Sequence, residues 1–490
     1  MNVYTTEKIR NIGLFGHQGA GKTSLAEALL YCSGVTDRLG KVENGNTVAD
    51  FDPDEIKRCM SVFSALTPTV WGEYKFNIVD TPGFFDFIAE TLGALRVTDC
   101  AVLVAAANSG IEVGLEKVWG QCEERSKPRL LFVNKMDKEN ANFQHILDES
   151  KEKLPGARVA PVQLPIGAAE NFTGVVDLVE QKAYTFDAKG VPSETAIPAD
   201  LADEVEAARE QLMEVAAEAT DELTEKYFEA MELSTEELKE GLKILVAKGS
   251  VVPALCGSSA TLKGIHLLAD EIVNYVPAPG GEVEAVDAEG QSVEIAVDPK
   301  DPVVALIFKT SSDPYVGKIS YLRIFAGTLH PDCVLHNQAK GVDEKIGNLL
   351  FIRGKSQEKI SEAPAGDIVA VARLGASSTG DTLSDASRKV TLPGLDLPRP
   401  FYSRAIYAKS KADEDKLSAN LQRLLQEDPT LQLERVEETH QTIITGIGDV
   451  QIDLCVERLK RMGVDVELAA RKIPYRETLK GKVSEDYRHK

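Results

Sequence analysis

Residues 9–32 read IRNIGLFGHQGAGKTSLAEALLYC and combine three signals in one stretch. An apolar run, Ile9–Phe15, leads into a glycine-rich turn, and residues 23–32 then show helical spacing. Residues 16–23 fit the pattern G-x-x-x-x-G-K-[ST], which forms a phosphate-binding loop between a strand and a helix. Glycines let backbone N–H groups converge on phosphate oxygens, and the helix N-terminus adds a favourable potential. A glycine turn that only packs a helix is the alternative, and this strand–turn–helix context disfavours it.

Two side chains of this loop have specific chemistry. Lys22 can supply a point charge to the β and γ phosphates, and the Thr23 hydroxyl can bind Mg²⁺. Together with a glycine from the next motif, the predicted phosphate-binding residues are Gln18, Gly19, Ala20, Gly21, Lys22, Thr23, Ser24 and Gly83.

Further apolar runs follow the loop and alternate with helical segments. The runs cover residues 75–80, 100–107, 129–135 and 251–256, and helical spacing covers residues 111–125 and 264–275. Strands that alternate with helices form right-handed βαβ units, so the sequence predicts an α/β fold with a parallel, doubly wound sheet. Ligands of such sheets bind at the carboxyl ends of the strands, which makes the residues just after each run the candidates for a site.

DTPG, residues 80–83, follows the strand predicted at residues 75–80. Asp80 is placed to hold the metal ion, and the backbone N–H of Gly83 can contact the γ-phosphate and couple it to the next segment. An aspartate with a Pro-Gly turn is a weak signal alone. Its position after the phosphate loop makes it a specific one.

NKMD, residues 134–137, and CGSS, residues 256–259, end two later strands. The carboxylate of Asp137 can accept hydrogen bonds from N1–H and the exocyclic amine of guanine, whereas adenine presents the wrong edge. A P-loop ATPase or metabolite kinase is the competing interpretation, and it requires Asp137 to be irrelevant. The predicted guanine-binding residues are Asn134, Lys135, Asp137, Ser258 and Ser259, and the motif set predicts a switch that binds GTP and GDP.

Length and composition limit what else the chain can be. Its 490 residues correspond to about three domains. The net charge of −22 excludes a uniformly basic nucleic-acid binder, and no apolar run is long enough to span a bilayer. The seven cysteines are scattered without CxxC spacing, which argues against zinc and is typical of a reducing cytoplasm.

Beyond the motifs, three regions have distinct patterns. Residues 155–249 interrupt the βα rhythm, and from Asp200 to Glu240 they hold 15 acids and three bases. Residues 277–299 indicate a linker or an exposed hairpin, and residues 302–390 indicate a small closed β-barrel. Residues 402–469 predict a β-α-β-β-α-β order, a split βαβ sandwich. Asp413 is the predicted cap of its first helix, and the spacing of Leu417, Leu421, Leu424 and Leu425 predicts the buried face of that helix.

The motifs and several longer segments make the chain resemble translation elongation factor G nearly from end to end. The segments are VQLPIGAAENFTGVVDLV, AGDIVAVARL, STGDTL and HQTIITGIGDVQID. The resemblance implies a GTP-binding G domain at 1–282 with an insertion at about 155–249, a linker at 283–300, a β-barrel domain II at 301–395 and a ferredoxin-like domain III at 400–475. It also implies that residues 476–490 start a fourth domain in which the chain is truncated.

Three departures from the family pattern make the chain more similar to elongation factor G-like paralogues. Phe84 stands where the family has a histidine that orients the attacking water, and a phenyl ring offers no hydrogen bond. Gly19 stands where an aspartate is usual. Ser61 stands where a Mg²⁺-binding threonine is expected and keeps the hydroxyl, so the predicted metal ligands are Thr23, Ser61 and Asp80.

Two functions therefore stay open. One is a ribosome-stimulated GTPase that drives a translocation-type step, with slow hydrolysis on its own. The other is a non-hydrolysing, GTP-gated factor that binds, protects or recycles ribosomes. The resemblance implies a cytoplasmic monomer whose partner is the ribosome, through the stalk protein at the acidic insertion, with neither DNA nor a membrane as a partner. A solvated helix face is the alternative explanation of that acidic region.

Overall fold

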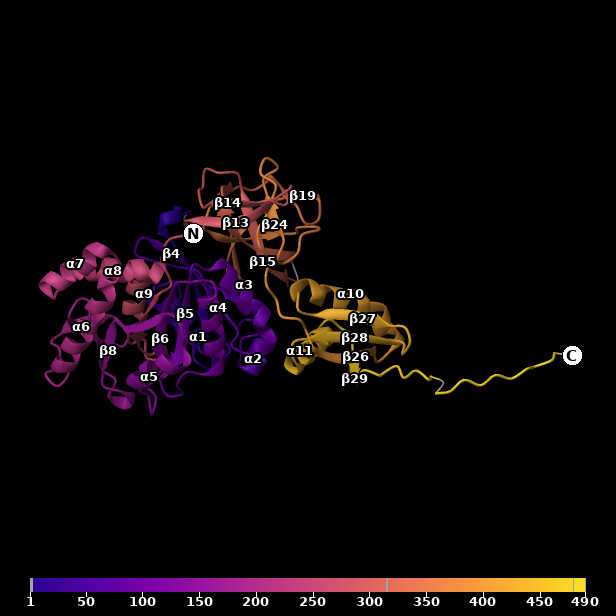
Figure 1. The fold of residues 1–490 in the computed structure, drawn as a ribbon, viewed down its shortest axis with the longest axis horizontal. Helices are drawn as coiled ribbons and strands as arrows, with labels where there is room; N and C mark the ends of the chain where they lie inside the picture. The colour runs from indigo at the N-terminus through magenta and orange to yellow at the C-terminus, as the bar shows by residue number, and fades with distance from the viewer. Residues whose placement is uncertain (1–2, 314–315, 479, 490) are drawn as a thin grey trace. The chain divides into compact units, whose positions relative to one another are not determined.

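The computed structural model describes residues 3–313, 316–478 and 480–489. The chain divides into two units, one ending at Leu397 and the other beginning at Pro398, and each is described by itself. Figure 1 labels their elements. Among the described residues, no helix has the length and apolarity needed to cross a membrane.

The first unit is built on one large sheet. Its strands are β1 (Ile9–Phe15), β2 (Ala65–Leu66), β3 (Thr69–Trp71), β4 (Tyr74–Asp80), β5 (Cys100–Ala106), β6 (Arg129–Asn134), β7 (Arg158–Pro161) and β12 (Val251–Cys256). The order is β2-β4-β1-β5-β6-β12-β7, and β3 also pairs with β4. Along this order, every pair of neighbouring strands from β4 through β1, β5, β6 and β12 to β7 is parallel. Strands β2 and β3 run antiparallel to β4. The predicted doubly wound sheet is confirmed.

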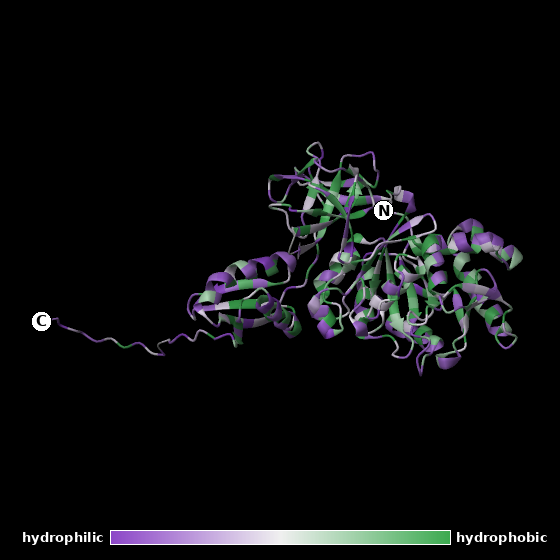
Figure 2. Ribbon diagram, turned by 180° about the vertical axis from the view of Figure 1, so that it is seen from behind, coloured by the Kyte–Doolittle hydropathy of each residue, from purple (hydrophilic) through white to green (hydrophobic). Residues whose placement is uncertain are grey.

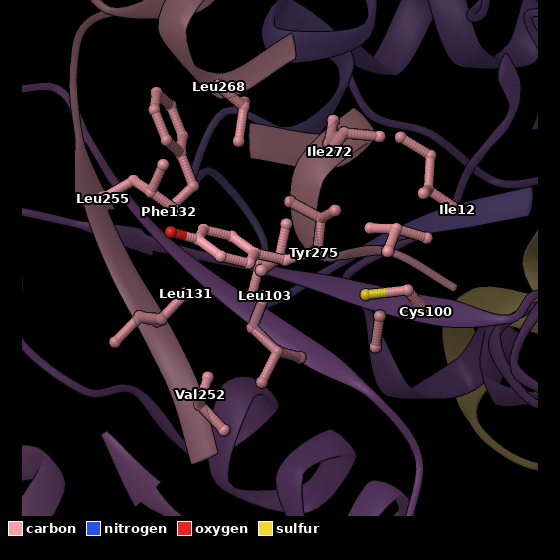
Figure 3. Packing of buried hydrophobic residues seen from close by; sticks show 14 of the residues in the cluster. Ile12, Cys100, Leu103, Leu131, Phe132, Val252, Leu255, Leu268, Ile272 and Tyr275 are labelled. Atoms are coloured by element: carbon pink, nitrogen blue, oxygen red, sulfur yellow. The ribbon is translucent and has the colours of Figure 1, made fainter. Parts of the chain in front are cut away.

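Helices cover both faces of this sheet. They are α1 (Lys22–Cys32), α2 (Pro53–Arg58), α3 (Ile88–Val97), α4 (Val113–Glu123), α5 (Phe143–Lys153) and α9 (Ile265–Tyr275), with the short 3-10 helices η1 (Thr6–Lys8), η2 (Val42–Asn44) and η3 (Phe85–Phe87). Every residue of β1, β5, β6 and β12 is buried, as expected for strands with helices on both sides. In Figure 3, Tyr275 from α9 lies among Leu103, Leu131 and Phe132 from the strands.

The segment predicted as an insertion is partly built into the main sheet. Its first strand, β7, pairs with β12, so residues 158–161 extend the sheet rather than interrupt it. The remainder forms a four-stranded antiparallel sheet and three helices: β8 (Gln163–Ile166), η4 (Ala169–Asn171), β9 (Gly174–Asp177), β10 (Lys182–Phe186), β11 (Pro192–Thr195), α6 (Ala202–Ala217), α7 (Asp221–Ala230) and α8 (Thr235–Ala247). Figure 2 shows long purple stretches on these helices, where the acidic residues lie.

Of the two predictions for residues 277–299, a linker or an exposed hairpin, the structure shows the hairpin, so the linker expected at 283–300 is wrong. Its strands β13 (Glu282–Asp287) and β14 (Ser292–Ala296) pair antiparallel, and β13 also pairs with β25 (Val390–Thr391). Ala285 and Ile295 are buried, so the segment packs against the body and is not a free connection. The patterning is weak because exposed glutamates alternate with the residues that face the body.

An antiparallel eight-stranded sheet follows, as a β-barrel domain requires. Its strands are β15 (Val304–Asp313), β16 (Gly317–Ala326), β18 (Val334–Asn337), β19 (Val342–Lys345), β20 (Leu349–Arg353), β21 (Ser356–Ile360), β23 (Ile368–Ala372) and β24 (Thr382–Ser384), and β17 (Thr328–Leu329) pairs with β22 (Ala363–Pro364). One face of these strands encloses a single apolar cluster, so the sheet is strongly curled. The β-rich domain agrees with the predicted β-barrel, and among the described residues β19 and β21, at the two ends of the strand order, are not paired with each other.

Buried ion pairs join this β-rich domain to the nucleotide-motif domain. Lys75 Nζ lies 2.6 Å from Asp367 Oδ1, with both side chains almost fully buried. Arg323 Nη2 lies 2.9 Å from Asp99 Oδ1. Because buried charges are costly unless paired, these contacts specify how the two domains dock.

The second unit has the predicted β-α-β-β-α-β order. Its elements are β26 (Tyr402–Ala408), α10 (Lys411–Glu427), β27 (Gln432–Val436), β28 (Gln441–Gly446), α11 (Asp449–Arg461) and β29 (Val466–Ala469), and the sheet order is β27-β28-β26-β29. Leucines of α10 are buried as their spacing predicted. The predicted cap was wrong: Ser410 is the N-cap, and its hydroxyl accepts from the N–H of Asp413. Residues 470–478 and 480–489 lie in no helix or strand.

Candidate functional site

The phosphate-loop motif connects β1 to α1 at the carboxyl end of the sheet. Gly16 has a φ of +149°, and a Cβ there would lie 2.4 Å from the carbonyl oxygen of Val104. Gly21 has a φ of +97°, and a Cβ there would lie 2.4 Å from Asn134 Nδ2. Only glycine satisfies both the backbone conformation and the close approach of the neighbouring strands.

Lys22 is directed back over this loop. Its ammonium group donates to the carbonyl oxygens of Gly16, at 3.1 Å, and His17, at 2.9 Å. Burial lowers the pKa of Lys22 to about 8. Among the described residues this buried cation donates hydrogen bonds to carbonyl oxygens alone, so it is well suited to bind phosphate oxygens, which would supply full negative charge.

The remaining predicted phosphate-binding residues are contiguous in the structure. Gln18 and Gly19 are exposed, Ala20 is buried, and Ser24 is half-buried in the first turn of α1. Gly19 has a φ of +80°, and a Cβ added to it would have nothing within 4 Å, so glycine fits here for backbone reasons and not for lack of space.

The three predicted metal ligands lie together. Thr23 Oγ1 donates to Asp80 Oδ2 at 2.7 Å and lies 3.0 Å from Ser61 Oγ. Asp80 Oδ1 is buried without a hydrogen-bond partner among the described residues. Burial, and then the nearby charge of Asp50, raises the pKa of Asp80 to about 7. Hydroxyl and carboxylate oxygens around an unsatisfied buried carboxylate fit Mg²⁺, which prefers oxygen ligands.

Asp50 is a site residue that the sequence analysis missed. It is buried, hydrogen-bonds to Ser61, and keeps one carboxylate oxygen without a partner among the described residues. It lies in an irregular stretch that matches no motif quoted above. Its one detectable signal was its position between the phosphate loop and Ser61.

Two buried glutamates order the segment that contains Asp50 and Ser61. Glu27 Oε1 accepts from the backbone N–H of Val48 at 2.7 Å. Glu55 Oε1 accepts from the N–H groups of Val62 and Phe63, each at 3.0 Å. These bonds replace regular secondary structure as the means of fixing the chain next to the predicted metal ligands.

The DTPG turn touches the phosphate loop directly. A Cβ on Gly83 would lie 2.5 Å from Lys22 Nζ and 2.6 Å from the backbone nitrogen of Gln18. The Thr81 hydroxyl donates to the carbonyl oxygen of Leu14 at 2.6 Å, which ties the turn to β1. The backbone of Gly83 is therefore next to the loop that the motif assigns to phosphate.

Phe84 follows this turn and has only apolar contacts to offer. It is the residue that precedes η3, and its ring centroid lies 6.2 Å from that of Phe87, which is buried. A ring in this position cannot donate or accept a hydrogen bond to a water molecule.

NKMD and CGSS meet at the end of β6 and β12. Asn134 Nδ2 donates to the carbonyl oxygen of Ala20 at 3.0 Å, and Asn134 Oδ1 accepts from both the N–H and the hydroxyl of Ser259 at 3.0 Å. Ser258 Oγ donates to Asp137 Oδ1 at 2.6 Å, which fixes the orientation of that carboxylate. Lys135 has a φ of +64°. The side-chain amide of Asn134 thus joins the phosphate loop to the two motifs predicted to bind guanine, NKMD and CGSS.

Comparisons with known proteins agree with these motifs over the whole chain. The family model of the elongation factor Tu GTP binding domain matches residues 7–278, elongation factor G domain 2 matches 302–386, and elongation factor G domain III matches 397–470. Proteins named elongation factor G from Thermotoga petrophila and Thermotoga maritima are each 40% identical over 484 residues, which is 97% of this chain and 69% of theirs.

A solved structure from Thermus thermophilus has the same fold. It is similar with a TM-score of 0.86 and 31% identity, and the match covers 96% of this chain and 68% of that one. With three family models in order and 40% identity to proteins named elongation factor G over 97% of its length, this chain belongs to the elongation factor G family of translational GTPases.

Proposed function

We propose that this chain is a GTP-driven conformational switch that acts on the ribosome in a translocation-type step and works in the cytoplasm. The observation that carries this proposal is the bonding of Asn134 to Ala20 on one side and to Ser259 on the other. That amide joins the phosphate loop to the two predicted guanine motifs, which supports a single site for a ligand that carries both phosphates and a purine.

The residues divide the work of binding GTP. Lys22 and the loop backbone would hold the β and γ phosphates, and the oxygens of Thr23, Ser61 and Asp80 would hold Mg²⁺, which would supply charge neutralisation to the phosphates. Asp137 accepts from the Watson–Crick edge of guanine, and the stem of Lys135 covers the base plane. Gly83 and Ser61 connect the γ-phosphate to the two segments that change shape on hydrolysis.

Calorimetry tests the base specificity. With Mg²⁺ present, we expect the chain to bind GDP and not ADP. Asp137→Asn should weaken GDP binding by about 3–6 kcal/mol, because two hydrogen bonds to a charged acceptor are lost. Asp148→Asn, a substitution of an exposed aspartate on α5, is the matched control and should bind normally. Equal affinity for GDP and ADP would refute the proposal.

A second candidate function is a GTP-gated ribosome-binding factor that does not hydrolyse GTP. Phe84 favours it, since a phenyl ring cannot orient water and orientation contributes orders of magnitude to the rate. Single-turnover hydrolysis with and without ribosomes separates the two. Ribosome-stimulated release of phosphate supports the GTPase, and ribosome binding that requires GTP without release supports the second candidate.

A further inference from the structure

Phe84 offers no hydrogen bond to an attacking water, so another uncharged polar group beside the predicted γ-phosphate position would have to orient it. This inference rests on the proposed function. The γ-phosphate position is bounded by Lys22, the backbone of Gly83 and the segment that ends at Ser61.

Gln18 lies at the meeting point of these three boundaries. The backbone nitrogen and Cα of Gln18 lie 2.6 and 2.8 Å from the place where a Cβ on Gly83 would be. The Gln18 side chain extends to the Ser61 segment, where its Nε2 lies 3.1 Å from the sulfur of Met60, the residue before Ser61. The carboxamide therefore bridges the phosphate loop and the Ser61 segment, and the backbone that carries it lies beside the turn that precedes Phe84.

The present partner of this carboxamide is a weak one. A thioether accepts hydrogen bonds poorly, whereas an amide has two N–H donors and an oxygen with two lone pairs. Gln18 is exposed, so its oxygen and second N–H are not enclosed by protein. A water molecule or a phosphate oxygen would be a better partner than the Met60 sulfur.

Other polar side chains nearby are less suited to this role. His17 uses Nδ1 to accept from the N–H of Gly114 at 3.2 Å, and its Nε2 lies 3.6 Å from Glu112 Oε1, so both ring nitrogens face α4. Asp86 carries a negative charge that a triphosphate repels. An uncharged amide has neither disadvantage.

We propose that the Gln18 carboxamide orients the attacking water in GTP hydrolysis by this chain. Its oxygen accepts a hydrogen bond from the water, and its N–H donates to a γ-phosphate oxygen. The water oxygen then forms a bond to the γ-phosphorus while the bond from that phosphorus to the β–γ bridging oxygen breaks. The proton of the water passes to phosphate, which leaves with GDP as the second product. Gln18 itself gains and loses no proton.

The test is single-turnover hydrolysis of GTP by the full chain, measured with and without ribosomes, for Gln18→Met, Phe84→His and the double variant. Methionine keeps the length and removes the hydrogen bonds. We expect Q18M to lower the rate constant by at least about tenfold while GDP affinity, measured separately, changes by less than about twofold. Adding F84H should restore the rate, because an imidazole supplies an independent orienting group.

Gln144→Met, at an exposed position on α5, is the matched control and should hydrolyse GTP at the wild-type rate. An unchanged or faster rate for Q18M would overturn the inference, and so would a loss that F84H does not rescue. A parallel loss of GDP affinity would assign Gln18 a purely structural role. Absence of hydrolysis by the wild-type chain would also overturn it. Failure of guanine selectivity in calorimetry would instead overturn the proposed function, so the two failures are distinguishable.

Discussion

The buried pair between Lys75 and Asp367 gives a sharp prediction for how the first unit is held together. Lys75 Nζ lies 2.6 and 2.8 Å from the two carboxylate oxygens of Asp367, and the two side chains are only 2% and 5% exposed. Lys75→Met keeps the apolar stem but removes the ammonium group, whose Nζ also lies 4.5 Å from the centroid of the Phe351 ring. Asp367 then keeps the Asn77 amide at 3.0 Å and the N–H of Ile368 at 2.8 Å.

These two uncharged donors, the Asn77 amide and the Ile368 N–H, do not neutralise the buried Asp367 carboxylate as the Lys75 ammonium group does. Breaking a buried pair from one side costs about 3–5 kcal/mol, because the other charge stays buried. We expect K75M to lower the unfolding free energy of the first unit by about that amount. The double variant K75M/D367L should recover most of the loss, since an apolar pair of similar volume is often neutral.

Urea unfolding followed by tryptophan fluorescence measures this effect. The chain has two tryptophans, Trp71 and Trp119, and both lie in the first unit. Lys359→Met, at an exposed position on β21, is the control and should unfold like the wild type. A K75M midpoint equal to that of the control would refute the reasoning, as would a double variant no more stable than either single one.

Three further predictions concern the site. Gly83→Ala adds a Cβ 2.5 Å from Lys22 Nζ, and overpacking of this kind costs about 1–3 kcal/mol. We expect the affinity for a non-hydrolysable GTP analogue to fall about five- to hundredfold while the affinity for GDP stays almost normal. An equal loss of affinity for both nucleotides would contradict this prediction. Asn134→Ala removes the three hydrogen bonds by which this amide joins the phosphate loop to Ser259, and calorimetry should show GDP binding weakened by about 2–4 kcal/mol. A change below about 1 kcal/mol would show that these hydrogen bonds do not hold the site together. Burial raises the pKa of Glu55 to about 8 from its usual 4.5. Between these two pH values the folded state keeps the carboxyl proton and the unfolded state loses it, so the free energy of unfolding falls as the pH rises from about 4.5 to 8. Glu55→Gln should therefore gain stability relative to wild type between pH 5 and 8 in urea titrations, and a difference independent of pH would exclude the mechanism.

The sequence pattern predicted much of this fold because the spacing of apolar residues within one strand or helix decides which of its faces is buried. Apolar runs of four to eight residues predicted β1, β4, β5, β6 and β12 within about a residue. Leucine spacing predicted α10 and its buried face. The N-cap of α10 was misassigned by three residues because Ser410 and Asp413 bond to each other, and either can begin such a pattern.

Features that depend on distant partners escaped the sequence analysis. For β13 and β14 the weak patterning left both a linker and a hairpin open, and the structure shows a hairpin that packs through the buried residues Ala285 and Ile295. β7 looked like part of an insertion, and it joins the main sheet because β12 returns beside it much later in the chain. Asp50 lies in a segment without regular secondary structure, so the periodicity of apolar residues gave no sign that it would be buried beside the site.

By itself, the sequence determined the kind of chemistry: a lysine-bearing phosphate loop, an acid after the second strand and a carboxylate for guanine, each ending a strand of one parallel sheet. It also determined what is missing, a hydrogen-bonding side chain at position 84. Tertiary structure alone decided that Asp50 joins Asp80 at the metal position, that Gln18 reaches Met60, and that Lys75 pairs with Asp367, 292 residues away. The physical reason is that hydrogen bonds and ion pairs act over a few ångströms, and only the folded chain brings such positions within that reach.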